Sequence, residues 1–239
     1  MSSKYVIIDC GLDMGQGHHL SHLKVALNGL DANASDITLL ANNAVNQDSI
    51  DGVRVIADLK STGYEAFQNP DVAEERRSVE TLGLGFLKRD ALLAQADKIL
   101  VFNVTPNVLA GLLLWMQYRG RPLSNRLCLY MLCGVGVERR LGPLFVETDK
   151  DRTALIRKAV ATCLARASKT TWYVTSPMRR QELRKLGAHP IALYSHYSDP
   201  VCAHTSAKTK RPSHVLLSVG DARPSKGTNR LPELTNRCL

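Results

Sequence analysis

Two glycine-containing loops hold the residues best suited to chemistry. The first is Gly11-Leu12-Asp13-Met14-Gly15-Gln16-Gly17-His18-His19, which follows an apolar run and leads into a helical pattern. Free N–H groups at the start of a helix attract anions, and glycine lets a ligand approach the backbone closely. One of the histidines would donate a hydrogen bond to a hydroxyl or phosphate group. The candidate ligand-binding residues of this loop are Gly15, Gln16, Gly17, His18 and His19.

The spacing in this loop leaves two other interpretations open. Gly15 and Gly17 are not followed by a glycine three residues later, which departs from the G-x-G-x-x-G fingerprint, and the glycines can instead serve only to form a tight strand-to-helix turn. His18 and His22 would share one helical face, which allows a metal site. Zinc proteases have His-Glu-x-x-His, however, and His19 stands in the place of that glutamate. We therefore expect no required metal and no cofactor.

The second loop is Gly220-Asp221-Ala222-Arg223-Pro224-Ser225-Lys226-Gly227, between an apolar run at residues 214–219 and a helical pattern at 229–234. The planar guanidinium of Arg223 and the ammonium of Lys226 would together bind a diphosphate. Exposed turns also carry Arg and Lys without such a role. By itself, the loop favours a diphosphate site no more strongly than a plain surface turn.

The elements that must position these loops alternate between strands and helices. Helices are expected to start after the capping hydroxyls of Thr105 and Ser176, each followed by proline, and Gly187 is expected to end the last one. The alternation predicts an α/β fold with a doubly wound, mostly parallel, Rossmann-like sheet. The patterns predict strands at residues 5–10, 37–40, 53–56, 99–102, 127–132, 172–175 and 191–194, and helices at 17–30, 71–95, 106–118, 151–167 and 176–186.

The pattern changes after residue 198. Residues 199–213 are polar, basic and rich in turn-forming residues, which is typical of a linker. Residues 214–239 then supply only a strand, a turn and the first turns of a helix, which is too little to bury a core. We expect a Rossmann-like N-terminal domain at residues 1–198 and the incomplete start of a second domain at 214–239.

Charge, composition and cysteine content limit the function classes. Residues 1–119 hold 10 Lys and Arg against 14 Asp and Glu, and residues 120–239 hold 21 against 8, so the two parts carry −4 and +13. A basic half attracts phosphates, but aromatic residues make up only 5% and no recognition motif is present, so nucleic acid is not an expected partner. The apolar stretches are too short for a membrane-spanning helix or a signal peptide. The six cysteines form no CxxC pair, which favours reduced, mostly buried thiols in a cytoplasmic protein.

Taken together, the two loops resemble a bacterial glycosyltransferase family of the two-Rossmann-domain (GT-B) architecture, the retaining "glycosyl transferases group 1", or family 4. Its second domain opens with a strand and a Gly-Arg-x-x-x-x-Lys-Gly-like turn. Lys226 keeps the family's place six residues after Gly220, whereas Arg223 stands three residues after that glycine rather than one. The helix from Ser176 resembles the family's Thr-Ser-Glu helix. The family's histidine in the middle of the first domain has no counterpart near Cys133, so no catalytic residue is assigned.

The resemblance implies hexosyl transfer from a nucleotide-sugar donor to a saccharide or lipid-linked acceptor. It implies that residues 15–17 lie beside the sugar and phosphates, and that Arg223 and Lys226 hold the diphosphate and stabilise the leaving group. The family's acidic Glu-x7-Glu motif is absent, so we expect a truncated acceptor-side domain that needs a further C-terminal domain for transfer.

Two further expectations complete the sequence-based interpretation. A lipid-linked acceptor would bring the protein to the inner face of an anionic membrane as a peripheral protein. The basic residues Arg179, Arg180, Arg184 and Lys185 are nevertheless expected to form a solvated helix face, since charge runs on helices usually face water. The alternative to a glycosyltransferase is a non-catalytic Rossmann-like module that binds a nucleotide or a protein partner.

Overall fold

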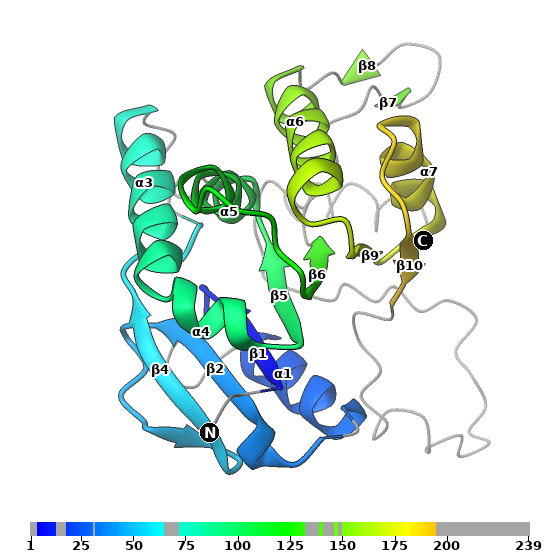
Figure 1. The fold of residues 1–239 in the computed structure, drawn as a ribbon. Helices are drawn as coiled ribbons and strands as arrows, with labels where there is room; N and C mark the ends of the chain where they lie inside the picture. The colour runs from blue at the N-terminus through cyan, green and yellow to red at the C-terminus, as the bar shows by residue number, and fades with distance from the viewer. Residues whose placement is uncertain are drawn as a thin grey trace, which may run out of the picture. The chain divides into compact units, whose positions relative to one another are not determined.

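The computed structural model describes residues 4–12, 18–30, 32–64, 72–131, 139–140, 146–147 and 150–194 (Figure 1). The chain divides into two units, Met1–Ser198 and Asp199–Leu239, and all of the described residues belong to the first. The expected linker and second-domain start therefore lie outside the described residues.

An eight-stranded sheet forms the centre of the first unit, in the order β10-β9-β6-β5-β1-β2-β4-β3. Neighbouring strands run parallel, except that the short β3 is antiparallel to β4. The prediction of an α/β fold with a mostly parallel sheet is confirmed. The strands are β1 (Tyr5–Asp9), β2 (Ile37–Asn42), β3 (Ser49–Ile50), β4 (Val53–Leu59), β5 (Lys98–Val104), β6 (Arg126–Met131), β9 (Thr170–Val174) and β10 (Ile191–Leu193), with β7 (Arg139–Arg140) and β8 (Val146–Glu147) paired separately.

Helices pack on both faces of this sheet, because successive strand residues point to opposite sides. Ile8 of β1 belongs to one apolar cluster, with side chains from α3 to α7, whereas its neighbour Ile7 belongs to another, with Leu23 of α1. Figure 1 shows the same division, with α1 apart from the other helices. The helices are α1 (His18–Gly29), α3 (Val72–Lys88), α4 (Asp90–Gln95), α5 (Pro106–Tyr118), α6 (Lys150–Arg166) and α7 (Pro177–Lys185), with the 3-10 turn η1 (Ala34–Asp36).

The predicted helix ends are confirmed by their hydrogen bonds. Thr105 Oγ1 accepts from the Val108 N–H at 3.2 Å, and Ser176 Oγ accepts from the Arg179 N–H at 3.3 Å. At the end of α7, Gly187 has φ 87° and its N–H donates to the Arg184 carbonyl at 2.9 Å. Serine and threonine hydroxyls thus cap two helices and a left-handed glycine ends one, as their sequence positions indicate.

The structure differs from the predicted elements at two places, for identifiable reasons. The helix predicted at residues 71–95 is interrupted: residues 72–95 form two helices that break at Arg89, because Asp58 binds both Lys88 Nζ and Arg89 Nε at 2.8 Å and so holds the end of α3. The strand β3 was not predicted. It pairs with β4 through Asp51 and Gly52, whose φ angles of 49° and 79° suit a two-residue hairpin turn, and Asp-Gly is a sequence signal for that turn.

Helices α3 and α5 lie close together because each has a glycine at their contact. A Cβ on Gly83 would lie 2.8 Å from Leu114 Cδ2, and a Cβ on Gly111 would lie 2.7 Å from Leu82 Cβ. Glycine at both positions lets the helix backbones approach. This contact fixes α5, which follows β5, against the helix that follows β4.

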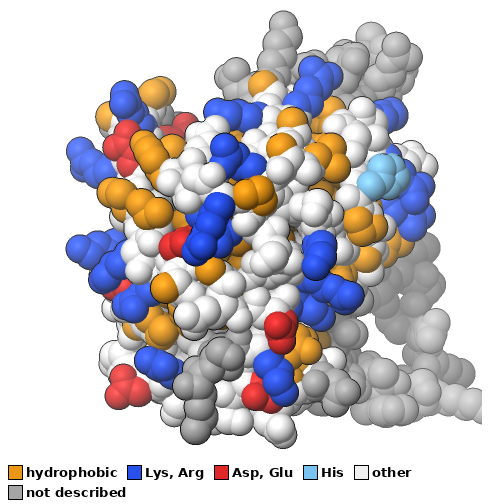
Figure 2. All heavy atoms as spheres, viewed as in Figure 1, with side chains coloured by type: hydrophobic (Ala, Val, Ile, Leu, Met, Phe, Trp, Pro, Cys, Tyr) orange, Lys and Arg blue, Asp and Glu red, His pale blue; other side chains and the backbone are white. Residues whose placement is uncertain are grey.

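The basic residues of α7 correct one expectation about the surface. Arg184 and Lys185 are exposed, but Arg179 and Arg180 are half-buried, and the Arg179 guanidinium donates to Thr175 Oγ1 at 3.1 Å. The four residues therefore do not form one solvated face. Lys and Arg side chains are spread over the surface seen in Figure 2, among hydrophobic and uncharged ones. Among the described helices, none has both the length and the apolar character needed to span a membrane.

The three described cysteines, Cys10, Cys128 and Cys163, are buried thiols outside any disulfide, as predicted. Burial raises the pKa of the Cys163 thiol to about 11 and raises the pKa of the Cys128 thiol as well. Since the thiolate is the nucleophilic form, these two are poor nucleophiles at neutral pH.

Candidate functional site

The strand order reverses between β1 and β5, which pair with each other at the middle of the sheet. From β1 the chain proceeds to β2 and β4 on one side, and then crosses to β5 and β6 on the other. In open parallel sheets, ligands bind at the carboxyl ends of the strands beside such a switch point. The first glycine-containing loop leaves β1 at this place.

Three polar side chains meet there: Asp9 from the end of β1, His19 from the first turn of α1 and Asn103 from the end of β5. His19 Nδ1 lies 2.8 Å from Asp9 Oδ1. Asn103 Nδ2 lies 3.2 Å from Asp9 Oδ2 and 2.9 Å from His19 Nδ1. Asp9 is fully buried, and the Gly11 N–H also donates to its Oδ1 at 3.2 Å. We refer to Asp9, His19 and Asn103 as the switch-point cluster.

Backbone geometry places Asn103 in this cluster. Its φ is 51°, in the left-handed region that asparagine tolerates better than most residues. The register between β5 and β6 shifts between Val101 and Val104, and such irregularities change the direction in which side chains point from a strand. The buried amide of Asn103 is therefore presented to Asp9 by a local departure from regular strand geometry.

The His19 ring is held by Gly11 and Tyr64. Its centroid is 5.6 Å from that of Tyr64, with the rings 83° apart, and the His19 side chain is 12% exposed. A Cβ on Gly11 would lie 2.7 Å from Tyr64 Cε2 and 2.8 Å from His19 Nε2. Only glycine at position 11 leaves room for the ring in this orientation.

The segment that presents Tyr64, residues 61–64, is tied to α3 and α5 by buried hydrogen bonds. Ser61 Oγ lies 2.8 Å from Ser78 Oγ of α3. Thr105, which caps α5, donates its hydroxyl to the Gly63 carbonyl at 2.8 Å. The helices on one face of the sheet thus help to position a ring beside α1 on the other.

We expect Gly11→Ala to displace His19 from Asp9, because the added methyl group would overlap the imidazole ring. The loss of this charge-assisted hydrogen bond should lower the free energy of unfolding by about 1.5 kcal/mol in urea denaturation. Gly29→Ala in α1 is the control, since no atom lies within 4 Å of its added Cβ. Alanine there should stabilise the protein by about 0.5 kcal/mol. Equal effects of the two substitutions would contradict the packing around Gly11.

The cluster offers proton-transfer and hydrogen-bonding chemistry. The Asp9 carboxylate and the Asn103 amide both lie against His19 Nδ1, at 2.8 and 2.9 Å, so Nδ1 donates to the carboxylate when it carries a hydrogen and accepts from the amide when it does not. No group of three or more His, Cys, Asp or Glu residues within the described ranges is arranged to hold a metal ion.

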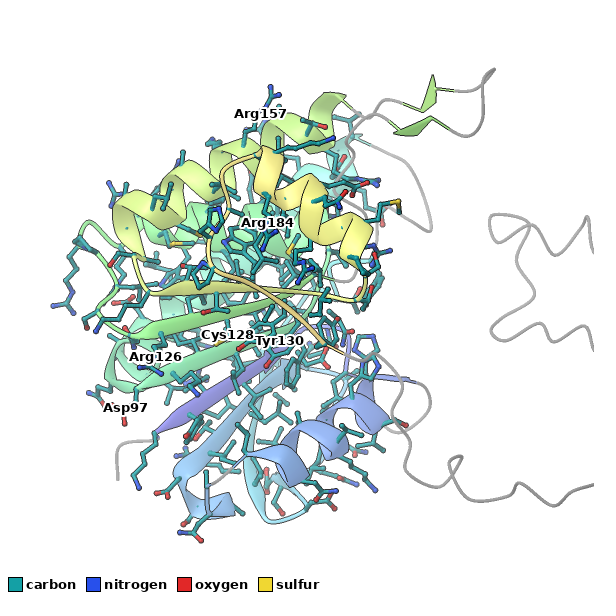
Figure 3. All side chains as sticks on the ribbon, turned by 90° about the vertical axis from the view of Figure 1, so that its right-hand side faces the viewer. Asp97, Arg126, Cys128, Tyr130, Arg157 and Arg184 are labelled. Atoms are coloured by element: carbon teal, nitrogen blue, oxygen red, sulfur yellow. The ribbon has the colours of Figure 1, made fainter. Side chains whose placement is uncertain are left out.

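Aromatic side chains continue this edge of the sheet toward β10. The rings of Tyr130 and Tyr173 stack with centroids 4.4 Å apart and planes within 8°. Phe102, beside Asn103, and Tyr194 contact Tyr130 edge-on at 4.8 and 5.2 Å. In Figure 3, Arg126, Cys128 and Tyr130 follow one another along β6 toward this edge. Burial raises the pKa of Tyr130 and Tyr173, so both stay neutral phenols at physiological pH.

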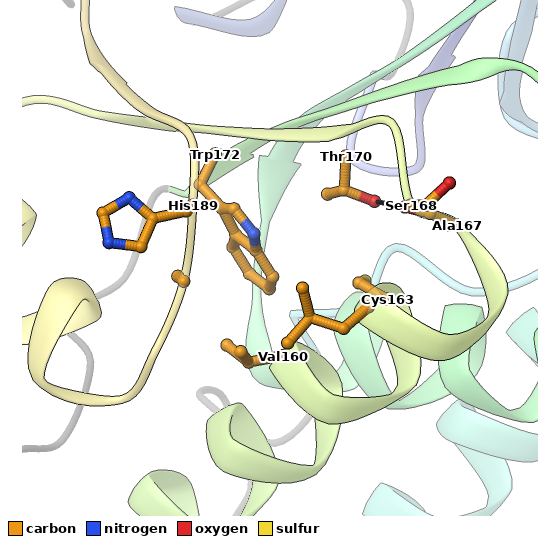
Figure 4. Close-up of a pocket in the computed structure, with 9 residues that line it drawn as sticks. Val160, Cys163, Ala167, Ser168, Thr170, Trp172 and His189 are labelled. Atoms are coloured by element: carbon orange, nitrogen blue, oxygen red, sulfur yellow. Dashed lines mark hydrogen bonds between the residues drawn. The ribbon is translucent and has the colours of Figure 1, made fainter.

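A small pocket lies elsewhere, between the end of α6 and the start of β9 (Figure 4). Its lining is mainly apolar and includes Val160, Cys163, Trp172 and His189. Because it adjoins the amino end of β9, it lies at the opposite edge of the sheet from Asp9. The pocket and the switch-point cluster are separate features.

The structure brings together His19, which the sequence suggested, and Asp9 and Asn103, which it did not. An aspartate that ends an apolar strand directly before a glycine-containing loop was a usable signal for Asp9. His18 begins α1, but its side chain lies outside the described part, as do Gly15, Gln16 and Gly17. Arg223 and Lys226 also lie outside it, so the diphosphate site stays a prediction.

Comparisons of the chain with models of known protein families, with curated proteins and with solved structures give no match.

Proposed function

We propose that this chain is the acceptor-side part of a GT-B glycosyltransferase, which moves a hexosyl group from a nucleotide-sugar donor to a saccharide or lipid-linked acceptor. The observation that carries the proposal is the switch-point cluster: a buried carboxylate and an amide hold an imidazole at the carboxyl edge of the sheet, beside a glycine-containing loop. An imidazole in that place suits an acceptor hydroxyl, which needs a partner for its proton.

The donor is proposed to bind through its phosphates. The first N–H groups of an α-helix have no partner within the helix and attract anions, and α1 begins at His18, directly after residues 15–17. Arg223 and Lys226 would hold the diphosphate and stabilise the charge that develops on it as the glycosidic bond breaks. A lipid-linked acceptor would place the protein against an anionic membrane, where basic surface residues favour binding.

The first experiment is a thermal-shift screen of the full chain against UDP, GDP, ADP and their sugar conjugates, with NAD as a contrast. A ligand that binds the native state must raise the unfolding midpoint. A shift with one nucleotide diphosphate family, followed by sugar transfer to a saccharide acceptor, is the expected result. Binding without transfer to any acceptor would favour the non-catalytic nucleotide-binding module instead.

Lys226→Ala should weaken binding of that nucleotide by about 1.5–3 kcal/mol, the range for a hydrogen bond to a charged group. Isothermal titration calorimetry measures this change directly. Lys158→Ala is the matched control, because it removes the same charge from an exposed position on α6. If both variants bind the nucleotide as tightly as the wild type, Lys226 is not part of the donor site.

A further inference from the structure

We infer that the outer side of α6 and α7 is a docking surface for an anionic lipid bilayer. The inference gives the membrane contact of the proposed function a defined surface, and it rests on that function for the lipid-linked acceptor that would bring the protein there. The surface, which we call the basic face, consists of exposed side chains from both helices: Arg157, Lys158, Leu164, Met178, Arg184 and Lys185.

The charge over this part of the fold is almost entirely positive. Residues 152–194, from the first turn of α6 to the residue after β10, contain nine Lys and Arg residues and a single acidic residue, Glu182. Glu182 is only 7% exposed, so its carboxylate is largely withdrawn from the surface. None of the four cations of the basic face forms an ion pair with another described residue. Their charges are therefore available to an anionic partner.

Helical spacing brings these side chains to one side of each helix. Residues three or four apart share a helix face. The exposed positions recur at this interval: 154, 157, 158, 161, 164 and 165 in α6, and 177, 178, 181, 184 and 185 in α7. The opposite sides of the two helices, which include Ile156 and Leu183, belong to one apolar cluster with residues of the sheet. The exposed sides of both helices therefore point away from the same face of the sheet.

The two helices are neighbours on that face (Figures 1 and 3). Val160 Cγ1 of α6 would lie 3.9 Å from a Cβ on Gly187, the glycine that ends α7. Leu164 of α6 and His189, just beyond α7, line the same small pocket. In the upper right of Figure 2, over α6 and α7, Lys, Arg and hydrophobic side chains are seen without Asp or Glu among them. The basic face is thus one surface shared by two helices.

The apolar side chains of the basic face favour a bilayer over other anionic partners. Leu164 is 60% exposed and Met178 is 51% exposed, and both lie among cations. At a membrane, Lys and Arg contact the lipid phosphates while apolar side chains enter the boundary between headgroups and acyl chains. A single-stranded nucleic acid would instead use aromatic rings on which its bases stack, and the exposed positions of α6 and α7 carry no aromatic residue.

Helix α3 carries exposed arginines in a different electrostatic setting, which makes it a matched control. It has three basic and three acidic residues, and Arg76 Nε lies 2.9 Å from Glu80 Oε1. Arg76 and Arg77 are adjacent and exposed, as are Arg184 and Lys185 on α7. Replacing either pair by glutamine lowers the net charge of the chain by the same amount. A difference between the two double variants therefore reports where the charge is, not how much there is.

The experiment measures co-sedimentation of the full chain with vesicles of equimolar phosphatidylglycerol and phosphatidylcholine, and with vesicles of phosphatidylcholine alone. The wild type should bind only the anionic vesicles. Each Lys or Arg close to an anionic membrane strengthens binding about fivefold, so Arg184→Gln/Lys185→Gln should bind about 25-fold more weakly. Arg76→Gln/Arg77→Gln should stay within about twofold of the wild type, because charges farther from the bilayer than the Debye length are screened. Equal losses in both double variants would overturn the assignment of the surface.

Leu164→Ser tests whether the partner is a bilayer. Removing an apolar side chain that enters the membrane should weaken vesicle binding about fivefold or more. The same substitution should not change binding of single-stranded DNA, measured by fluorescence anisotropy at the same salt concentration. Unchanged vesicle binding by Leu164→Ser would overturn the bilayer as the partner. Tighter binding of the wild type to the DNA than to the vesicles would also overturn it and assign the face to nucleic acid.

The outcomes separate this inference from the proposed function, because vesicle binding needs no nucleotide sugar. A wild type that transfers sugar to a water-soluble saccharide but does not bind anionic vesicles overturns the docking surface and leaves the transferase proposal intact. A wild type that binds vesicles through Arg184 and Lys185 but transfers no sugar to any acceptor supports the surface and overturns the proposed function. Vesicle binding that Arg184→Gln/Lys185→Gln leaves unchanged would place the contact elsewhere in the chain and overturn the inference.

Discussion

Trp115→Ala is expected to lower the free energy of unfolding by about 3–5 kcal/mol, the range for truncating a fully buried aromatic side chain. Trp115 lies on α5, is 0% exposed, and contacts Phe86 of α3 with ring centroids 6.4 Å apart. Its Nε1 donates to Asp90 Oδ1 at 2.9 Å. Alanine would leave a large cavity between α3, α4 and α5. Urea denaturation followed by circular dichroism measures the loss.

Trp115→Phe separates the hydrogen bond from the volume of the side chain. Phenylalanine keeps most of the buried ring but cannot donate to Asp90, so the expected loss is about 1–2 kcal/mol. Asp90 keeps its ion pair with Arg119 Nε at 2.9 Å in this variant. If Trp115→Ala were no more destabilising than Trp115→Phe, the ring would not be part of a tightly packed core.

Gly63→Ala is expected to destabilise the protein by about 2–5 kcal/mol, through two effects that add. Gly63 has φ 76°, a conformation that costs a residue with a Cβ about 1–2 kcal/mol. The added methyl group would also lie 2.5 Å from Val108 Cγ2 and 3.1 Å from Thr105 Oγ1. Overlap in a packed interior usually costs a further 1–3 kcal/mol, roughly. Urea denaturation measures the sum.

Gly120→Ala is the matched control, because Gly120 has φ 78° but no atom lies within 4 Å of an added Cβ. It should show only the cost of the left-handed backbone conformation, about 1–2 kcal/mol of unfolding free energy. The difference between the two variants then measures the packing of residue 63 against the start of α5. Equal losses of unfolding free energy in the two variants would mean that the side chains around Gly63 move to accept the methyl group at no energetic cost.

Gly63 also links stability to the candidate site. It precedes Tyr64, whose ring contacts His19, and its carbonyl accepts from the hydroxyl of Thr105. A displacement of residues 61–64 would therefore also move the Tyr64 ring against the His19 ring. We expect Gly63→Ala to alter the His19 ring resonances, and Gly120→Ala to leave them unchanged.

Local sequence was sufficient for most secondary structure. Apolar β-branched runs with turn residues between them determine strands such as β1 and β5, because their side chains must be buried on a sheet. Thr105 and Ser176 determine helix starts, since a hydroxyl before proline satisfies free N–H groups of the first turn. These are short-range effects, which the order of neighbouring residues alone can encode. The break at Arg89 was missed because Asp58, a residue of β4, helps to define it.

The candidate site depended on contacts that local sequence does not encode. The loop residues around His19 indicated a ligand, and the alternation of elements predicted a parallel sheet. Only the tertiary structure placed Asn103, 84 residues away, beside His19. Asp9 and Asn103 meet because β1 and β5 pair at the point where the strand order reverses. Strand pairing between distant segments is decided by the packing of the whole sheet, so the sequence by itself determined the elements and the tertiary structure alone decided which of their side chains form a site.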